Sequence, residues 1–129
     1  MRCAFAFLLA AMFASAGMAA SLAPPARAEV DALLARLEAS ACEFNRNGSW
    51  HSAAEAKPHL LRKLAYLEDR GAVQTAEQFI DLAASNSSMT GEPYLVRCAG
   101  GAPVQSRVWL SAQLKALRSD PRTPASRPR

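Results

Sequence analysis

The sequence predicts an α+β domain that is mainly helical, with about four helices around a small antiparallel sheet and one disulfide. Apolar residues recur at helical spacing in four separate stretches. A short alternating stretch is interrupted by Asn47-Gly48, a pair typical of a two-residue hairpin turn. With 129 residues, the chain is expected to form one domain.

The first 28 residues are typical of a secretory signal peptide. Met1-Arg2 gives a positive start, and residues 4–20 form an almost unbroken apolar run. Small residues suited to cleavage end at Ala20 and at Ala28, and the Ala-x-Ala spacing favours Ala28. The run is short for a membrane span, so we expect a periplasmic or secreted protein with no stable membrane insertion after cleavage.

Residues 29–118 then form the expected domain, and residues 119–129 a disordered tail with three prolines and scattered arginines. The domain holds ten basic and ten acidic residues. Nucleic-acid binding usually requires a basic face, so this balance argues against a nucleic-acid partner. Cys42 and Cys98 remain after cleavage, and an even count in a small exported protein predicts a disulfide. Free or metal-binding thiols are the alternative.

The first half of the domain contains two helices and a hairpin. Helical spacing of apolar residues predicts a helix over residues 29–41, and residues 42–52 form the hairpin. Ser52 and Glu55 then form a capping box that begins a second helix, which ends near Gly71. Pro58 falls inside this helix, so either the helix kinks there or it begins at Pro58.

The second half of the domain is expected to contain two further helices and a strand. Thr75 and Gln78 form another capping box, which begins a helix that buries the small and aromatic positions up to Ala83. Residues 94–98 are expected to form a third strand, and residues 99–103 a flexible loop. Ser106 is expected to cap a fourth helix with three leucines on one face.

Six short motifs follow one another along residues 30–117. They are Phe44-x-Arg46-Asn47-Gly48, Ala53-x-Glu55-Ala56, His59-Leu60-x-x-Lys63, Thr75-Ala-Glu-Gln-Phe-Ile-Asp81, Ala84-Ser85-x-Ser87-Ser88 and Thr90-Gly91-x-Pro93-Tyr94. In this order and spacing the chain resembles the YfeK-like family of small exported bacterial proteins, a domain of unknown function. The resemblance implies a bacterial source and a periplasmic location, and it implies no activity.

The favoured function is a non-enzymatic binding or interaction module. Arg46 at the hairpin tip exposes a planar guanidinium that suits carboxylate or phosphate groups. With Ser87, Ser88 and Tyr94 it makes up the candidate surface for a periplasmic protein or a small anionic ligand. In the alternative interpretation, Asn47-Gly48 serves only the turn, Arg46 pairs with Glu43 or with an acid of the second helix, and the serines only complete a loop.

Two other functions remain open. Glu55, His59 and Lys63 share a helix face, so a small hydrolase or cell-wall-modifying enzyme could use His59 as acid/base beside Glu55 or Glu77. A stress-related structural or chaperone-like protein would instead show an exposed apolar patch. The histidines and cysteines match no zinc spacing, so we expect no metal and no cofactor.

Overall fold

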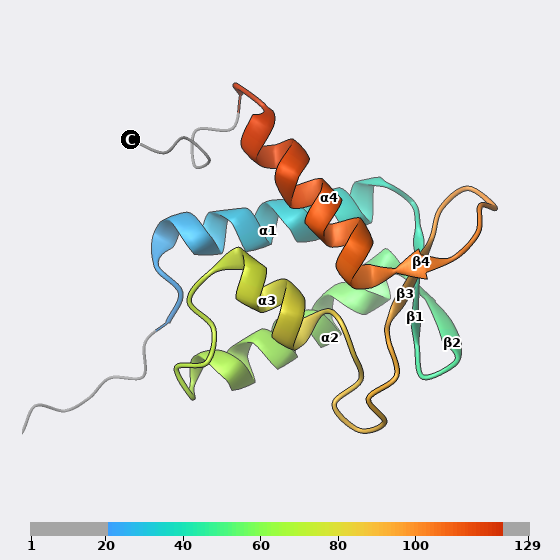
Figure 1. Ribbon diagram of the computed structural model, residues 1–129, viewed down its shortest axis with the longest axis horizontal. Helices are drawn as coiled ribbons and strands as arrows, with labels where there is room; N and C mark the ends of the chain where they lie inside the picture. Colours follow the sequence, from blue (N-terminus) through green and yellow to red (C-terminus); the bar gives the residue numbers. More distant parts are fainter. Residues whose placement is uncertain (1–20, 123–129) are drawn as a thin grey trace, which may run out of the picture.

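Four helices and a four-stranded antiparallel sheet make up residues 21–122, the part of the chain that this computed structural model describes (Figure 1). The elements are α1 (Pro24–Ala39), β1 (Glu43–Arg46), β2 (Ser49–Ser52), α2 (Ala53–Glu68), α3 (Ala76–Ala83), β3 (Leu95–Arg97), β4 (Val104–Gln105) and α4 (Ser106–Ser119). The predicted fold class is confirmed. The apolar run of the expected signal peptide and residues 123–129 of the expected tail lie outside the described residues.

Helix α1 begins at Pro24, five residues before the predicted start at Glu29. Proline suits the first helical turn, because its φ is already helical and its missing N–H has no partner there in any case. The segment before the helix also belongs to the fold. The Leu22 side chain is 8% exposed, and its backbone N–H donates to Glu68 Oε2 at 2.9 Å.

The hairpin between β1 and β2 is confirmed, with the turn at the predicted pair. Arg46 pairs with Ser49, and the two residues between them, Asn47 and Gly48, have φ of 52° and 82°. Such positive values are those of the turn that matches strand twist, and Asn and Gly adopt them at low cost. Arg46 is therefore the last strand residue before the tip.

The sheet has the order β2-β1-β3-β4, one strand more than predicted (Figure 1). The loop predicted over residues 99–103 returns the chain into β4, where Val104 pairs with Val96. Two residues are too few for alternation to appear in the sequence. Because β1 and β3 are neighbours, Cys42 and Cys98 meet and form the predicted disulfide, with Cα atoms 4.3 Å apart. Closing this loop contributes about 4 kcal/mol in the chain-entropy model.

Helix α2 runs through Pro58, so the alternative in which it begins at Pro58 is wrong. The cap explains the upstream start: Ser52 Oγ accepts from the backbone N–H of Glu55, and it donates to the Glu55 carboxylate. These bonds stabilise the first turn by about 1 kcal/mol, which partly offsets the hydrogen bond that Pro58 removes. The helix therefore begins at Ala53, directly after β2, and not at Pro58.

The caps of the last two helices differ. Thr75 Oγ1 accepts from the backbone N–H of Gln78, as predicted for α3. Ser106 is not the cap of α4, contrary to the prediction. It is the first helical residue, and its buried hydroxyl has no hydrogen-bond partner within residues 21–122. Its backbone N–H instead donates to the carbonyl of Tyr94, which joins α4 to the sheet.

One continuous core joins the two halves of the molecule. Helices α1, α2, α3 and α4 pack on one another, while α2 also covers β1 and β2, and α4 covers β3 and β4. The predicted leucine face of α4 is buried, and Ser119 still belongs to this helix rather than to the tail. Among the largest fully buried side chains are Leu33, Phe44, Leu60, Phe79, Tyr94 and Leu110.

The buried hydroxyl of Ser106 leads to a stability prediction. Ser106→Ala removes a polar atom that has no partner, so we expect the free energy of unfolding to stay equal or to rise by up to about 1 kcal/mol. Urea unfolding of wild type and variant measures this difference. Ser52→Ala is the matched control, because it removes a working cap and is expected to cost about 1 kcal/mol. A similar loss in both variants would show that Ser106 acts as a cap after all.

Candidate functional site

Three elements bring four polar side chains together beside the sheet. Arg46 ends β1, His59 and Lys63 lie one turn apart on α2, and Tyr94 immediately precedes β3. We call Arg46, His59, Lys63 and Tyr94 the Tyr94 cluster, because each of the other three side chains is linked to Tyr94 directly or through His59. The sequence analysis named all four, but as parts of different hypotheses.

Tyr94 is held in place on every side. Its ring is 2% exposed and packs against Phe44, with ring centroids 5.1 Å apart. Its backbone N–H donates to the carbonyl of Ser85, and its carbonyl accepts from Ser106, both at 2.8 Å. The hydroxyl oxygen lies 3.3 Å from His59 Nε2 and 3.1 Å from Lys63 Nζ. Tyr94 therefore positions these two side chains and offers little surface of its own to a partner.

The contacts of His59 fix its tautomer. Arg46 Nη1 lies 2.5 Å from Nδ1, and a guanidinium has only donors, so Nδ1 must be the acceptor. The ring proton is then on Nε2, where it donates to the Tyr94 hydroxyl. Burial, followed by the positive charges of Arg46, Lys63 and Arg62, lowers the pKa of His59 to about 4. His59 is therefore neutral at physiological pH.

Lys63 completes the cluster from the next turn of α2. Its ammonium donates to the carbonyl of Asn86 at 2.9 Å and to the Tyr94 hydroxyl, and it lies 4.9 Å from the Tyr94 ring centroid. Burial, and then the charge of Arg46, lower the pKa of Lys63. Burial raises the pKa of Tyr94, so its hydroxyl stays protonated and neutral while it accepts two hydrogen bonds.

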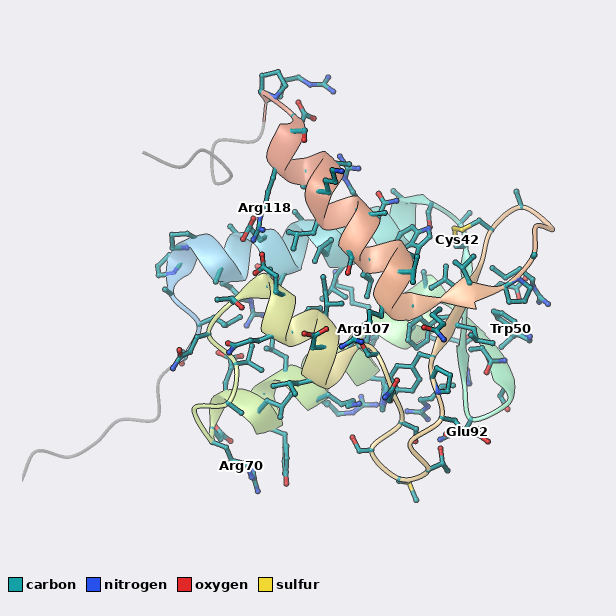
Figure 2. All side chains as sticks on the ribbon, in the orientation of Figure 1. Cys42, Trp50, Arg70, Glu92, Arg107 and Arg118 are labelled. Carbon is teal, nitrogen blue, oxygen red and sulfur yellow. A yellow bond between two sulfur atoms is a disulfide. The ribbon has the colours of Figure 1, made fainter. Side chains whose placement is uncertain are left out.

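The surface around the cluster is positively charged. We define the basic face as Arg46, His59, Arg62 and Lys63. Within residues 21–122, none of its three cations has a carboxylate at ion-pair distance, whereas Arg107 and Arg118 on α4 pair with acids of α3 and α1. Figure 2 shows Arg118 directed at these neighbours, away from the sheet.

One carboxylate approaches the basic face without joining it. Glu55 lines a small pocket of about 120 Å³ beside Arg46, His51 and His59. Its oxygens bind Ser52 Oγ at 3.2 Å and His51 Nδ1 at 3.3 Å. The alternative in which Arg46 pairs with Glu43 or with an acid of α2 is wrong, since Glu43 pairs with Arg97 and Arg46 contacts His59.

The structure separates the two serines that were predicted as binding residues. Ser87 is 5% exposed, and its hydroxyl accepts from the backbone N–H groups of Met89 and Thr90, so it shapes the loop between α3 and β3. Ser88 is exposed and lies beside His59, Arg62 and Lys63 in a larger groove. Thr90 Oγ1 donates to Asn47 Oδ1 at 3.1 Å, which fixes this loop against the hairpin tip.

Of the two carboxylates of the predicted hydrolase, only Glu55 lies near His59, and its oxygens are engaged by other residues. Glu55 is bound to Ser52 and His51, while Glu77 lies on α3 against Arg118, whose hydrogen bond lowers the pKa of Glu77. A histidine that acts as a general base requires a partner that orients it and a nearby nucleophile. Here both ring nitrogens of His59 are occupied by Arg46 and Tyr94, which favours a structural role.

Within residues 21–122, no group of three His, Cys, Asp or Glu side chains could hold a metal ion. No helix in this part of the chain is long and apolar enough to cross a membrane.

Arg62 is the site residue that the sequence analysis missed. It lies three positions after His59 on α2, so helical spacing alone places both on neighbouring positions of one face. The predicted pattern counted only positions four apart, namely Glu55, His59 and Lys63, and therefore passed over it. The spacing of three residues, which also places helical side chains on one face, was the signal left out.

Comparisons with known proteins give a family and no activity. A family model described as "Family of unknown function (DUF5329)" matches residues 24–118 and so begins at the first residue of α1. The uncharacterized protein YfeK of Salmonella typhimurium is 53% identical over 51 residues. This match covers 40% of the chain and 41% of that relative, so it spans less than half the length of either. No solved structure matches the chain.

The position of His59 predicts how it titrates. NMR should show a His59 midpoint near pH 4, and Arg46→Met should raise it toward 6.5, because one repelling charge is removed. The unfolded chain takes up this proton first as the pH falls, so stability should decrease from pH 6.5 to pH 4. Arg107→Met, which removes a cation paired with Asp81, is the control and should leave the midpoint unchanged. A wild-type midpoint near 6.5 would contradict the burial of His59 beside these cations.

Proposed function

The chain belongs to a family of unknown function, DUF5329, and from its own geometry we propose that it is an exported, non-enzymatic module that binds an anionic group at the basic face. The observation that carries this proposal is the excess of donors over acceptors around the Tyr94 cluster. Arg46 and Lys63 point at neutral partners, and no carboxylate within residues 21–122 neutralises them at ion-pair distance.

Electrostatics explains why such a face favours an anion. Burial and Arg46 already lower the pKa of Lys63, so holding both charges on one face costs free energy. A carboxylate or phosphate beside Arg62 and Lys63 would offset that repulsion and gain charge-assisted hydrogen bonds. The exposed Ser88 hydroxyl adds a neutral donor at the same place.

Two features support export. The apolar run in residues 4–20 is typical of a signal peptide. The disulfide between Cys42 and Cys98 is of a kind that persists in oxidising compartments such as the bacterial periplasm. We therefore propose a periplasmic location, in agreement with the resemblance on which the sequence analysis relied.

Anion binding is tested by titrating the protein with acetate and with phosphate at low salt, followed by NMR. Shifts should concentrate at α2 and residues 85–94, and added salt should weaken binding by screening.

Arg62→Gln should reduce the affinity for these anions about threefold to tenfold. The melting temperature should not change, because Arg62 is exposed and has no ion pair within residues 21–122. Lys115→Gln removes an exposed charge from α4 and serves as the control. If both variants lowered the affinity equally, the effect would come from the net charge of the protein, and the proposed site would be overturned.

The cleavage site is tested by the intact mass of the mature protein. The structure supports the upstream site, because a cut after Ala28 would remove the buried Leu22 and the Arg27 guanidinium, which lies 3.6 Å from Glu68. We therefore expect protein recovered from a bacterial periplasm to begin at Ser21 instead of at Glu29, the start favoured from the sequence. A mass that begins at Glu29 would show that the first turn of α1 is dispensable.

A further inference from the structure

We infer that the anion bound by this protein is the carboxylate head of a single-chain amphiphile, such as a free fatty acid, whose aliphatic chain lies in the groove between α2 and α3. This inference rests on the proposed function and names its ligand class. The groove has a volume of about 370 Å³. It is lined by His59, Arg62, Lys63, Tyr66, Leu67, Leu82 and Ser88.

The groove is polar at one end and apolar at the other. Along α2 the lining changes from His59, Arg62 and Lys63 to Tyr66 and Leu67 within about two helical turns. No carboxylate lines it, so its only formal charges are the cations of the basic face. A ligand complementary to this gradient has one anionic end and one apolar end.

The apolar end of the groove is exposed to solvent. Tyr66 is 57% exposed and Leu82 is 48% exposed, and both line the same groove from different helices. Arg70 covers one face of the Tyr66 ring, with its guanidinium carbon 3.5 Å from the ring centroid. Single exposed apolar residues need no explanation, but two that converge in a groove favour a ligand that covers them.

The size of the groove favours a small molecule over a protein partner. Ligand pockets usually measure about 300–1,000 Å³, and this groove lies near the lower limit. A single aliphatic chain suits that volume better than a lipid with two chains. A stable protein interface would instead require about 1,000 Å² or more of complementary surface.

Another groove of the molecule lacks these properties. The groove between α3 and α4 measures about 470 Å³, but Glu77, Asp81, Lys115 and Arg118 line it. Its two acids take part in ion pairs, Glu77 with Arg118 and Asp81 with Arg107 of α4. This groove therefore carries charges of both signs and does not offer an anion a purely cationic end.

The test is calorimetric titration of the mature protein with acetate, octanoate and decanoate, each below its micelle concentration. Affinity should increase about twofold to fourfold for each added methylene, because each is removed from water. Decanol, which lacks the charge, should bind at least tenfold more weakly than decanoate. Leu82→Gln should weaken decanoate about threefold or more and leave acetate unchanged. Val108→Gln, on an α4 residue that is 59% exposed and outside the groove, is the matched control.

The outcomes separate this inference from the proposed function. If acetate and phosphate bind but chain length gives no gain, the anion site stands and the amphiphile is wrong. If no anion binds at all, both proposals fail. Equal binding of decanol and decanoate would show that the charge is not recognised, and binding to anionic lipid vesicles without binding to monomeric decanoate would point to a membrane surface. Either result overturns the inference.

Discussion

The packing of Tyr94 is the constraint on which the rest of the structure depends. Its ring fills the core against Phe44, its backbone joins the loop after α3 to the start of α4, and its hydroxyl receives side chains from α2. A buried aromatic ring has few alternative positions in a close-packed core. Because the ring cannot move, the hydroxyl becomes a fixed reference point, and the positions of His59 and Lys63 follow from it.

Two neutral groups allow two cations to share one face. Arg46 and Lys63 are linked through His59 and the Tyr94 hydroxyl, and both intermediates are uncharged because burial lowers the pKa of the histidine and raises that of the tyrosine. Each of these two cations therefore donates to an uncharged acceptor, although the charge of Arg46 still lowers the pKa of Lys63. The hydrogen bonds satisfy the partly buried nitrogens, while the positive charge remains available to a ligand.

The sequence could predict most elements because local chemistry determines them. Ser52 and Thr75 start their helices through their own hydroxyls, and Asn47-Gly48 makes its turn through its own backbone. The predictions that fail concern features that depend on contacts between residues distant in the sequence. Strand β4 exists only because β3 offers it an edge, and Ser106 lost its predicted role because the carbonyl of Tyr94 engages its backbone. The cluster escaped prediction as one site for the same reason. Arg46, the His59–Lys63 pair and Tyr94 lie in three separate parts of the chain, and the β1–β3 pairing together with the packing of α2 on β1 brings them together.

The disulfide joins the two strands that hold the candidate site together. It links the residue before β1 to the residue after β3. Strand β1 ends at Arg46, and β3 begins directly after Tyr94. Thiols stay reduced in the bacterial cytoplasm and become oxidised outside it. A reduced chain must hold these strands together without a covalent link, so its basic face is less firmly formed than that of the oxidised chain. If the proposed export and anion binding hold, the redox state of a bond outside the groove would set how well the groove retains its ligand.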